Sequence, residues 1–268
     1  MFLNLEFKDT FKIIDTHCHL DDESFYDDLD EVLSHAFKNG IDKIIIPGAN
    51  IKDLARAREI AHTYEKIFYA AGVHPYEIST FDEELLKEHL KDEKCVAIGE
   101  CGLDYYRLKS EDIGLKETQK EIFMSQLELA REFKKPVIIH SRDANEDTYE
   151  ILKKYSKDLC GGVLHCFNAS KHLLKLADDG FYFGIGGVLT FKNAKNLAEI
   201  LPQIPKDKLL LETDAPYLTP EPFRGKRNDP LLTQMVANKM SEILNLPREE
   251  VLKLCFENSQ KLFFKGCE

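Results

Sequence analysis

Histidines and carboxylates recur in this sequence at positions where their side chains could bind metal ions. His17 and His19 stand two residues apart in the segment DTHCHLD, so on an extended strand both imidazoles point to the same face. Two divalent ions about 3.5–4 Å apart can activate water and stabilise both the attacking and the leaving oxygen of a phosphoryl displacement. A ligand set for two such ions sharing one bridging carboxylate is completed by His140, His165, Glu100 and Asp214.

These residues follow short apolar runs, which we interpret as buried β-strands. Most of the runs are apolar on consecutive residues, as in parallel strands that are buried on both faces. Amphipathic stretches with helical spacing lie between them, for example at residues 50–64, 116–134 and 146–156. The eight runs span residues 11–15, 43–48, 67–73, 95–100, 137–140, 161–166, 181–187 and 208–214.

Alternation of strand and helix eight times predicts an α/β fold, a (β/α)₈ TIM barrel, as one domain over residues 1–268. A doubly wound parallel sheet is the alternative. In a barrel the C-terminal strand ends meet at one mouth, so His17, His74, Glu100 and the other residues named above would converge. Within the helical stretches, Asn50 and Ser170 are predicted N-caps, and Pro247 fits the first turn of a last helix.

Composition excludes several classes of protein. The 268 residues carry a formal charge of −11, which argues against a broadly basic nucleic-acid coat but not against a nuclease with a local site. No apolar run approaches the roughly 18 residues of a membrane span, and Glu6 and Asp9 interrupt any signal-peptide core. The seven cysteines contain no CxxC and suggest reduced thiols in a cytoplasmic protein. The acidic segment 21–31 is expected to be a solvated loop and the first turn of a helix.

Seven motifs stand together in one order along the chain, and in this the sequence resembles the TatD family of metal-dependent deoxyribonucleases. That family belongs to the amidohydrolase superfamily and has a TIM-barrel fold. The similarity extends from residue 11 to about residue 264 and includes a closing FENSQKLF segment. The motifs are DTHCHLD, GVHP, GECGLDYY, HSRDA, HCF, ETDAPYLTP and RGKRNDP.

The resemblance implies a role for each residue of the site. His17, His19, Glu100 and Asp214 would bind one metal ion. Glu100, with His140 and His165, would bind the second, so that Glu100 bridges the two. His74 would face the substrate phosphate without binding metal, and Asp214 would orient the attacking water and accept its proton. Glu100 takes the place where superfamily relatives often carry a carbamylated lysine.

The expected function is hydrolysis of phosphodiester bonds in DNA, and the resemblance suggests a 3′→5′ exonuclease acting on a single-stranded end. The cofactors would be two divalent ions, with zinc, magnesium and manganese all open. No membrane and no obligate protein partner are expected. A metal-dependent amide or ester hydrolase, such as a D-aminoacyl-tRNA deacylase, is the alternative, and a metal-binding protein without turnover is a third possibility.

Substrate binding is assigned to His74, Arg142 and Arg227. Further basic residues that could meet phosphate are Lys192, Arg224 and Lys226, and the aromatic residues that could stack on bases are Tyr76, Tyr105, Tyr106, Phe167, Phe191 and Tyr217.

Cysteines beside the predicted ligands offer a competing zinc–thiolate interpretation. Cys18, Cys101 and Cys166 each adjoin a ligand, but neighbouring residues on a strand point to opposite faces, so their thiols should face the helices. Glu212 could orient a ligand or form an ion pair at the end of its strand. Ordinary surface or packing roles are expected for His35, His62, His89 and His172.

Overall fold

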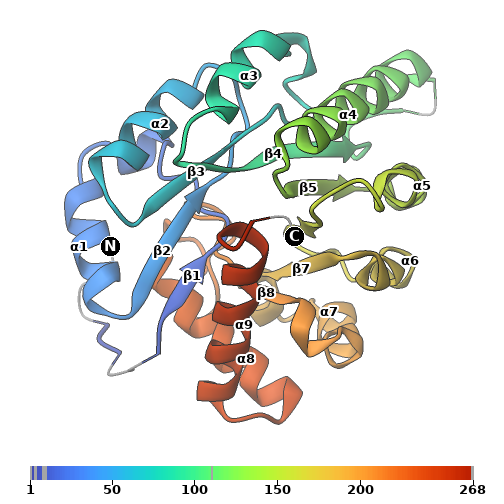
Figure 1. The fold of residues 1–268 in the computed structure, drawn as a ribbon. Helices are drawn as coiled ribbons and strands as arrows, with labels where there is room; N and C mark the ends of the chain where they lie inside the picture. Colours follow the sequence, from blue (N-terminus) through green and yellow to red (C-terminus); the bar gives the residue numbers. More distant parts are fainter. Residues whose placement is uncertain (1, 3–4, 8–10, 110, 267–268) are drawn as a thin grey trace.

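Eight parallel strands form one sheet in the order β1 to β8 in the computed structural model, which describes residues 2, 5–7, 11–109 and 111–266 (Figure 1). Every predicted run overlaps a strand, and the consecutive order confirms the (β/α)₈ barrel and excludes the doubly wound sheet. The strands are β1 (Ile13–Asp15), β2 (Ile41–Ile46), β3 (Ile67–Ala71), β4 (Cys95–Asp104), β5 (Val137–Arg142), β6 (Gly162–Leu164), β7 (Phe181–Ile185) and β8 (Leu209–Leu211).

The segments just beyond β1 and β8 close the ring. The N–H of Thr16 donates to the carbonyl of Leu211 (3.1 Å), and the N–H of Asp214 donates to the carbonyl of His17 (2.8 Å). A parallel bridge between Cys18 and Ala215 continues this pairing. The backbone that carries two predicted metal ligands, His17 and Asp214, is therefore part of the closure of the barrel.

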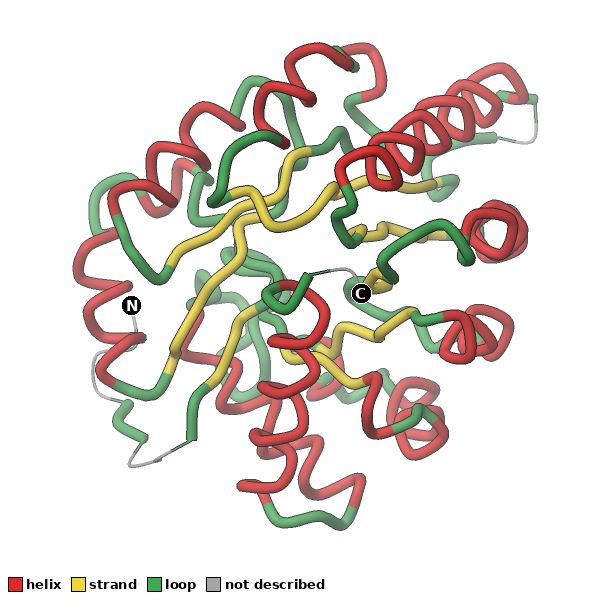
Figure 2. Tube along the Cα trace, viewed as in Figure 1, coloured by secondary structure: helices red, strands yellow, loops and turns green. Residues whose placement is uncertain are grey.

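Helices surround the strands in an outer ring (Figure 2). They are α1 (Leu29–Lys38), α2 (Leu54–Thr63), α3 (Glu83–Leu90), α4 (Ile113–Phe133), α5 (Asn145–Tyr155), α6 (Lys171–Leu174), α7 (Lys195–Ile200), α8 (Thr233–Leu244) and α9 (Arg248–Phe263). Short 3₁₀ turns are η1 (Glu23–Phe25), η2 (Ile78–Thr80), η3 (Lys175–Asp179), η4 (Gly187–Thr190), η5 (Leu201–Gln203), η6 (Lys206–Lys208) and η7 (Pro230–Leu232). None of the helices in the described part of the chain is both long and apolar enough to cross a bilayer.

Side-chain capping decides where some of these helices begin. The prediction for Ser170 is confirmed, since its side chain accepts the N–H of Leu173 at the start of α6. The prediction for Asn50 is wrong: its side chain accepts the N–H of Lys52 within a turn, and α2 begins only at Leu54. Pro247 lies one residue before the first turn of α9.

Alternation along the strands separates two apolar layers. In β2, Ile44 and Ile46 pack between the sheet and the helices, whereas Ile45 points into the barrel. Leu262 and Phe263 at the end of α9 pack against this interior layer. Its strand residues are Ile45, Ala70, Ala97, Ile138, Val163, Tyr182 and Leu210.

The structure tests the prediction that the cysteines are reduced. Five of them, Cys18, Cys95, Cys101, Cys166 and Cys255, are free. Cys160 is disulfide-bonded, which departs from the prediction of reduced thiols throughout, and Cys267 lies outside the described residues.

Candidate metal centre

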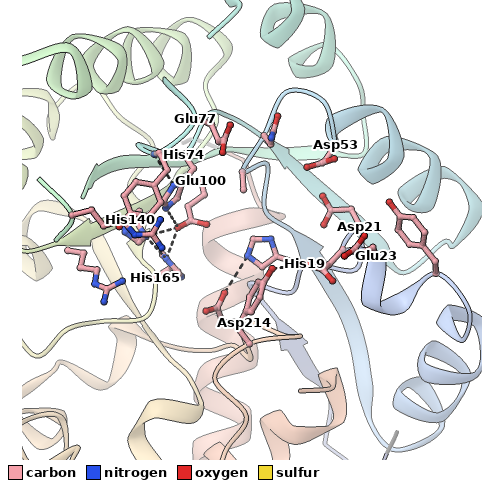
Figure 3. Close-up of a pocket in the computed structure, with 18 residues that line it drawn as sticks. His19, Asp21, Glu23, Asp53, His74, Glu77, Glu100, His140, His165 and Asp214 are labelled. Atoms are coloured by element: carbon pink, nitrogen blue, oxygen red, sulfur yellow. Dashed lines mark hydrogen bonds and ion pairs between the residues drawn. The ribbon is translucent and has the colours of Figure 1, made fainter. Parts of the chain in front are cut away.

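A cavity of about 760 Å³ opens at the C-terminal ends of the strands; we call it the mouth cavity (Figure 3). It lies where the parallel strands were expected to bring their terminal residues together. His17 lies beneath it and is completely buried. The predicted site residues in its lining are His19, His74, Glu100, His140, Arg142, His165 and Asp214.

Glu100 occupies the centre of this cluster. Its Oε1 lies 2.8 Å from His140 Nδ1 and 2.8 Å from His165 Nε2. Its Oε2 lies 3.3 Å from His17 Nε2 on the other side. Burial raises the pKa of Glu100, but the surrounding imidazoles outweigh burial and hold that pKa well below its usual range. The ionised carboxylate therefore presents each of its oxygens to a different set of imidazoles.

Asp214 stands on the opposite side, after β8. Its Oδ1 lies 3.4 Å from His19 Nε2 and 3.6 Å from His17 Nε2. Its backbone has φ of 59°, a left-handed conformation that a non-glycine residue adopts only where its surroundings enforce it. The hydrogen bond from its N–H to the carbonyl of His17 is one such constraint. The turn after β8 thus aims the carboxylate at the two histidines of the HxH pair.

Donor atoms in this cluster fit divalent cations. In the described part of the chain, three groups of donors lie within 4.8 Å of one another: His17, His165 and Asp214; His17, His19 and Glu100; and His74, Glu100 and His140. Both ring nitrogens of His17 and Nδ1 of His165 are buried and have no hydrogen-bond partner. Such orphaned buried groups cost about 1–3 kcal/mol each, and coordination of a cation would remove that cost. Imidazoles with carboxylates suit zinc, manganese, iron or nickel.

His74 was expected to face substrate and not metal. Its Nε2 lies 3.6 Å from Glu100 Oε1, within reach of the proposed ligands. Its Nδ1 accepts the N–H of Tyr76 (3.1 Å), so the neutral ring carries its proton on Nε2. Burial lowers the pKa of His74 to about 4, which keeps the ring neutral. A neutral Nε2–H is a hydrogen-bond donor, and this state favours the substrate role.

Asp104 is a residue of the site that the sequence analysis did not single out. Its Oδ2 lies 2.9 Å from His140 Nε2, and the N–H of Tyr106 donates to its Oδ1. Strand β4 runs to residue 104, well beyond the predicted end at residue 100, so Asp104 lies on the strand four residues after Glu100. The even spacing within GECGLD was the signal, because residues four apart on a strand share a face.

Glu212 is buried at the end of β8 and contacts the backbone that carries His165. Its Oε1 accepts the N–H of Cys166 (2.6 Å), directly after His165. Burial raises the pKa of Glu212 to about 7. This contact holds the backbone of the His165 turn, and it fits the positioning role that was one of the two alternatives.

Basic residues predicted at the mouth separate into two groups. Arg142 lines the cavity, with its guanidinium 3.7 Å from the ring centroid of Tyr106. Arg107, which was not predicted, lines it too and lies over Tyr76. Arg227 lies outside the lining and pairs with both carboxylate oxygens of Asp28, at 2.9 and 2.7 Å. Lys192, Arg224 and Lys226 also lie outside the lining.

One side of the mouth cavity is acidic. The acidic residues of segment 21–31 lie in a largely exposed loop and the first turn of α1, as expected, except that Asp21 is buried at the cavity. Asp21 is 9% exposed, and its Oδ1 is buried without a hydrogen-bond partner. Figure 3 shows several of these carboxylates opposite His140 and His165. The acidic wall, as we call it, comprises Asp21, Asp22, Glu23 and Asp53; Glu77 also lines the cavity but lies beside His74.

Cysteines and the remaining histidines lie away from the donor groups. Cys18 and Cys101 are buried in the layer between sheet and helices, and none of the three donor groups in the described residues includes a thiol. His62 contacts Asp92 (2.9 Å), and His89 contacts the hydroxyl of Tyr69 (3.2 Å). These contacts suit packing roles.

Comparison with known proteins agrees with this geometry. A profile of the family described as "TatD related DNase" matches residues 14–264. An uncharacterized metal-dependent hydrolase of Bacillus subtilis, YabD, is 42% identical over 94% of this chain and 98% of its own length. The 3′-5′ ssDNA/RNA exonuclease TatD of Escherichia fergusonii is 35% identical over 86% of this chain and 90% of its own length.

Solved structures show the same architecture. The crystal structure of YjjV, a TatD homologue from Escherichia coli, superposes with a TM-score of 0.86 at 32% identity and covers 94% of this chain and 97% of that one. A TatD family hydrolase from Entamoeba histolytica gives a TM-score of 0.82 at 28% identity, with 95% and 98% covered. With the donor cluster at the mouth of the barrel, these matches show that the chain belongs to the TatD-related DNase family.

Proposed function

We propose that this TatD-family metal-dependent hydrolase cleaves phosphodiester bonds of DNA, starting from the 3′ end of a single strand. The observation that carries the proposal is the position of Glu100, whose two oxygens face separate imidazoles. A carboxylate in that position suits two divalent ions, which is a common arrangement in phosphodiester hydrolases. The exonuclease named among the relatives supports the choice of nucleic acid as substrate.

In this proposal each residue of the site has its own role in the reaction. Divalent ions held by His17, His19, Glu100, His140, His165 and Asp214 would activate water and offset the charge that builds on the phosphoryl oxygens. Asp214, on the rim of the cluster, accepts the proton of the attacking water. His74 donates its Nε2–H to a phosphate oxygen. Phosphorus gains the water oxygen as its bond to the leaving oxygen breaks.

Side chains around the rim suit a nucleic-acid strand. Arg107 and Arg142 can pair with phosphates on either side of the scissile bond. Tyr26, Tyr76 and Tyr217 line the cavity and are 54%, 37% and 52% exposed, which is unusual for residues of that size. Exposed aromatic rings beside cationic groups form stacking platforms for unpaired bases. A single strand, whose bases are free to stack, fits this rim better than a duplex.

Labelled oligonucleotides test the proposal. Single-stranded DNA labelled at its 5′ end or at its 3′ end is incubated with metal-loaded protein, with chelated protein and with Glu100→Ala. A ladder that shortens from the 3′ end, and is absent in the chelated and Glu100→Ala samples, supports the proposal. Cutting that persists after chelation would contradict the mechanism.

The acidic wall favours a second candidate function. An amide or ester hydrolase acting on an aminoacyl substrate must bind an ammonium group, and the carboxylates of Asp21 and Asp53 would attract one. A D-aminoacyl-tRNA and its L-isomer, offered to the same metal-loaded protein, test this activity directly. Deacylation without release of nucleotides from DNA would replace the first proposal with the second.

A further inference from the structure

A second large cavity lies at the other end of the barrel, and we call it the rear cavity. Its volume is about 790 Å³. Gly161, Gly180 and Lys208 each stand just before a strand, so the cavity opens at the N-terminal strand ends, opposite the metal centre. Its other lining residues come from the C-terminal ends of α4 and α9 and the residues that follow them, from the segment after α5, from the end of η3 and from β7. No residue of the proposed active site lines this cavity.

The rear cavity is basic, although the whole chain carries a charge of −11. Its lining includes two acidic residues, Asp158 and Asp179. Asp179 is already paired, since Lys153 Nζ lies 2.7 and 2.8 Å from its carboxylate oxygens. Asp158 therefore offsets only part of the positive charge in the lining. Its six cationic residues are Arg131, Lys134, Lys157, Lys208, Lys261 and Lys265.

Four of these cations carry the argument: Lys157, Lys208, Lys261 and Lys265. Arg131 is set aside because it pairs with Glu128 (2.6 Å). Among the described residues, none of the four lysines forms an ion pair. Burial lowers the pKa of Lys208; the charge of Asp207 raises that pKa in part, and the charge of Lys261 lowers it again. Lysines that lie close together without ion-pair partners repel one another and destabilise the folded chain. An anion bound between them would replace this repulsion with attraction.

Three apolar side chains lie beside the lysines, and two of them, Tyr182 and Leu262, are buried and present little surface to the cavity. Tyr182 and Leu262 belong to the interior layer of the barrel, and Leu159 adds to the lining. Lys208 Nζ lies 4.6 Å from the ring centroid of Tyr182, so cation and aromatic face lie together. The lysines are therefore the groups that a ligand would meet first, which favours an anionic ligand.

We propose that the rear cavity binds a small phosphate ester of mononucleotide size, with its phosphate between Lys208 and Lys261. The volume lies within the range of small-molecule sites, about 300–1,000 Å³. A small ligand is favoured over a nucleic-acid strand because the lysines surround one concave site instead of a track that leads to the mouth. The site is independent of the reaction at the metal centre.

Photolabelling locates the ligand. The full-length, metal-loaded protein is labelled with 8-azidoadenosine monophosphate, and the modified peptides are mapped by mass spectrometry. Labelling of segment 157–161 or 261–265, which inorganic phosphate suppresses and unphosphorylated adenosine does not, is the expected result. Labelling confined to the mouth, around residues 19–26, 74–77 and 104–107, would overturn the proposal.

Charge reversal tests the lysines. Lys208→Glu combined with Lys261→Glu should weaken binding at the rear cavity about tenfold or more, without loss of metal or of DNA cleavage. The matched control is Lys171→Glu with Lys195→Glu, which changes the charge equally at exposed positions outside both cavities. If the double Glu variant does not fold, the double variant Lys208→Gln with Lys261→Gln, which removes the charges without reversing them, takes its place.

The outcomes separate the alternatives. Equal rear labelling in the reversal variant and the control would show that the lysines do not hold the ligand. Rear labelling of a long azido-oligonucleotide but not of the mononucleotide would assign the surface to a strand and refute the small-ligand site. Rear binding that persists in a protein without nuclease activity would leave this inference standing and reject only the proposed function.

Discussion

Asp104 Oδ2 lies 2.9 Å from Nε2 of His140, while Nδ1 of the same ring faces Glu100. A carboxylate on the far nitrogen of a metal-binding histidine fixes the orientation of the ring and raises its basicity. In the proposed metal centre, Asp104 would therefore act on the bound ion through His140.

Asp104→Asn should lower metal affinity by about 10- to 100-fold while leaving the barrel folded. Metal titration followed by calorimetry measures this, with circular dichroism as the check on folding. Asp178→Asn, at an exposed position, is the matched control. Equal affinities in the two variants would show that Asp104 has no part in metal binding.

Neighbouring residues in DTHCHLD should respond differently to substitution. His19→Ala should lose one ion because the imidazole faces Asp214, whereas Cys18→Ser should keep its metal because that thiol is buried on the helix side. Metal counting by inductively coupled plasma mass spectrometry on both variants compares them directly. Loss of metal in Cys18→Ser would revive the thiolate interpretation.

Asp214→Asn should preserve the fold and lower turnover by about 10²- to 10⁴-fold, since the amide cannot take the proton of the attacking water. Single-turnover cleavage of labelled DNA at saturating metal isolates the chemical step. Near wild-type rates would mean that another group accepts the proton.

Removal of metal should abolish DNA binding as well as cleavage. Seven acidic residues and two arginines line the mouth cavity, so without ions the site repels phosphate. Fluorescence anisotropy of a labelled single strand, at constant ionic strength, measures binding before and after chelation. Asp53→Asn with Glu77→Gln should bind DNA more tightly than wild type, and unchanged affinity would argue against electrostatic exclusion.

Arg142 and Arg227, both assigned to substrate binding from the sequence, should behave differently. Arg142→Gln should raise KM for DNA because its guanidinium lines the cavity. Arg227→Gln should leave KM unchanged and lower the free energy of unfolding by about 1 kcal/mol or less. Steady-state kinetics and denaturant unfolding on both variants give the comparison, and a raised KM in Arg227→Gln would restore the original assignment.

The stabilising effect of Arg227 should depend on pH. The hydrogen bonds from Arg227 hold the pKa of Asp28 below its ordinary value of 3.8. A depressed carboxylate pKa contributes stability above that ordinary value, and this contribution disappears as the pH falls through the folded-state pKa. The difference in unfolding free energy between wild type and Arg227→Gln should therefore shrink in acid. A difference that stays constant would mean that the pair does not stabilise the fold.

The sequence by itself determined the barrel and most of the donor cluster. The eight apolar runs were long and regular enough to be recognised as strands, and parallel topology forces their C-terminal ends to one rim. His17, Glu100 and Asp214 could therefore be placed together although they are far apart in the chain. The site residues were recognisable because each stands at the end of a run.

Tertiary structure alone decided which polar residues between the runs join the site. Asp104 had a signal in its even spacing from Glu100, but only loop packing buries Asp21 at the mouth and turns Arg227 to Asp28. Local sequence does not set these positions, because a charged side chain in a loop takes its partner from whichever segment packs beside it. The rear cavity has the same origin: its cationic residues come from four separate stretches of the chain, 131–134, 157, 208 and 261–265, and only closure of the barrel brings these together.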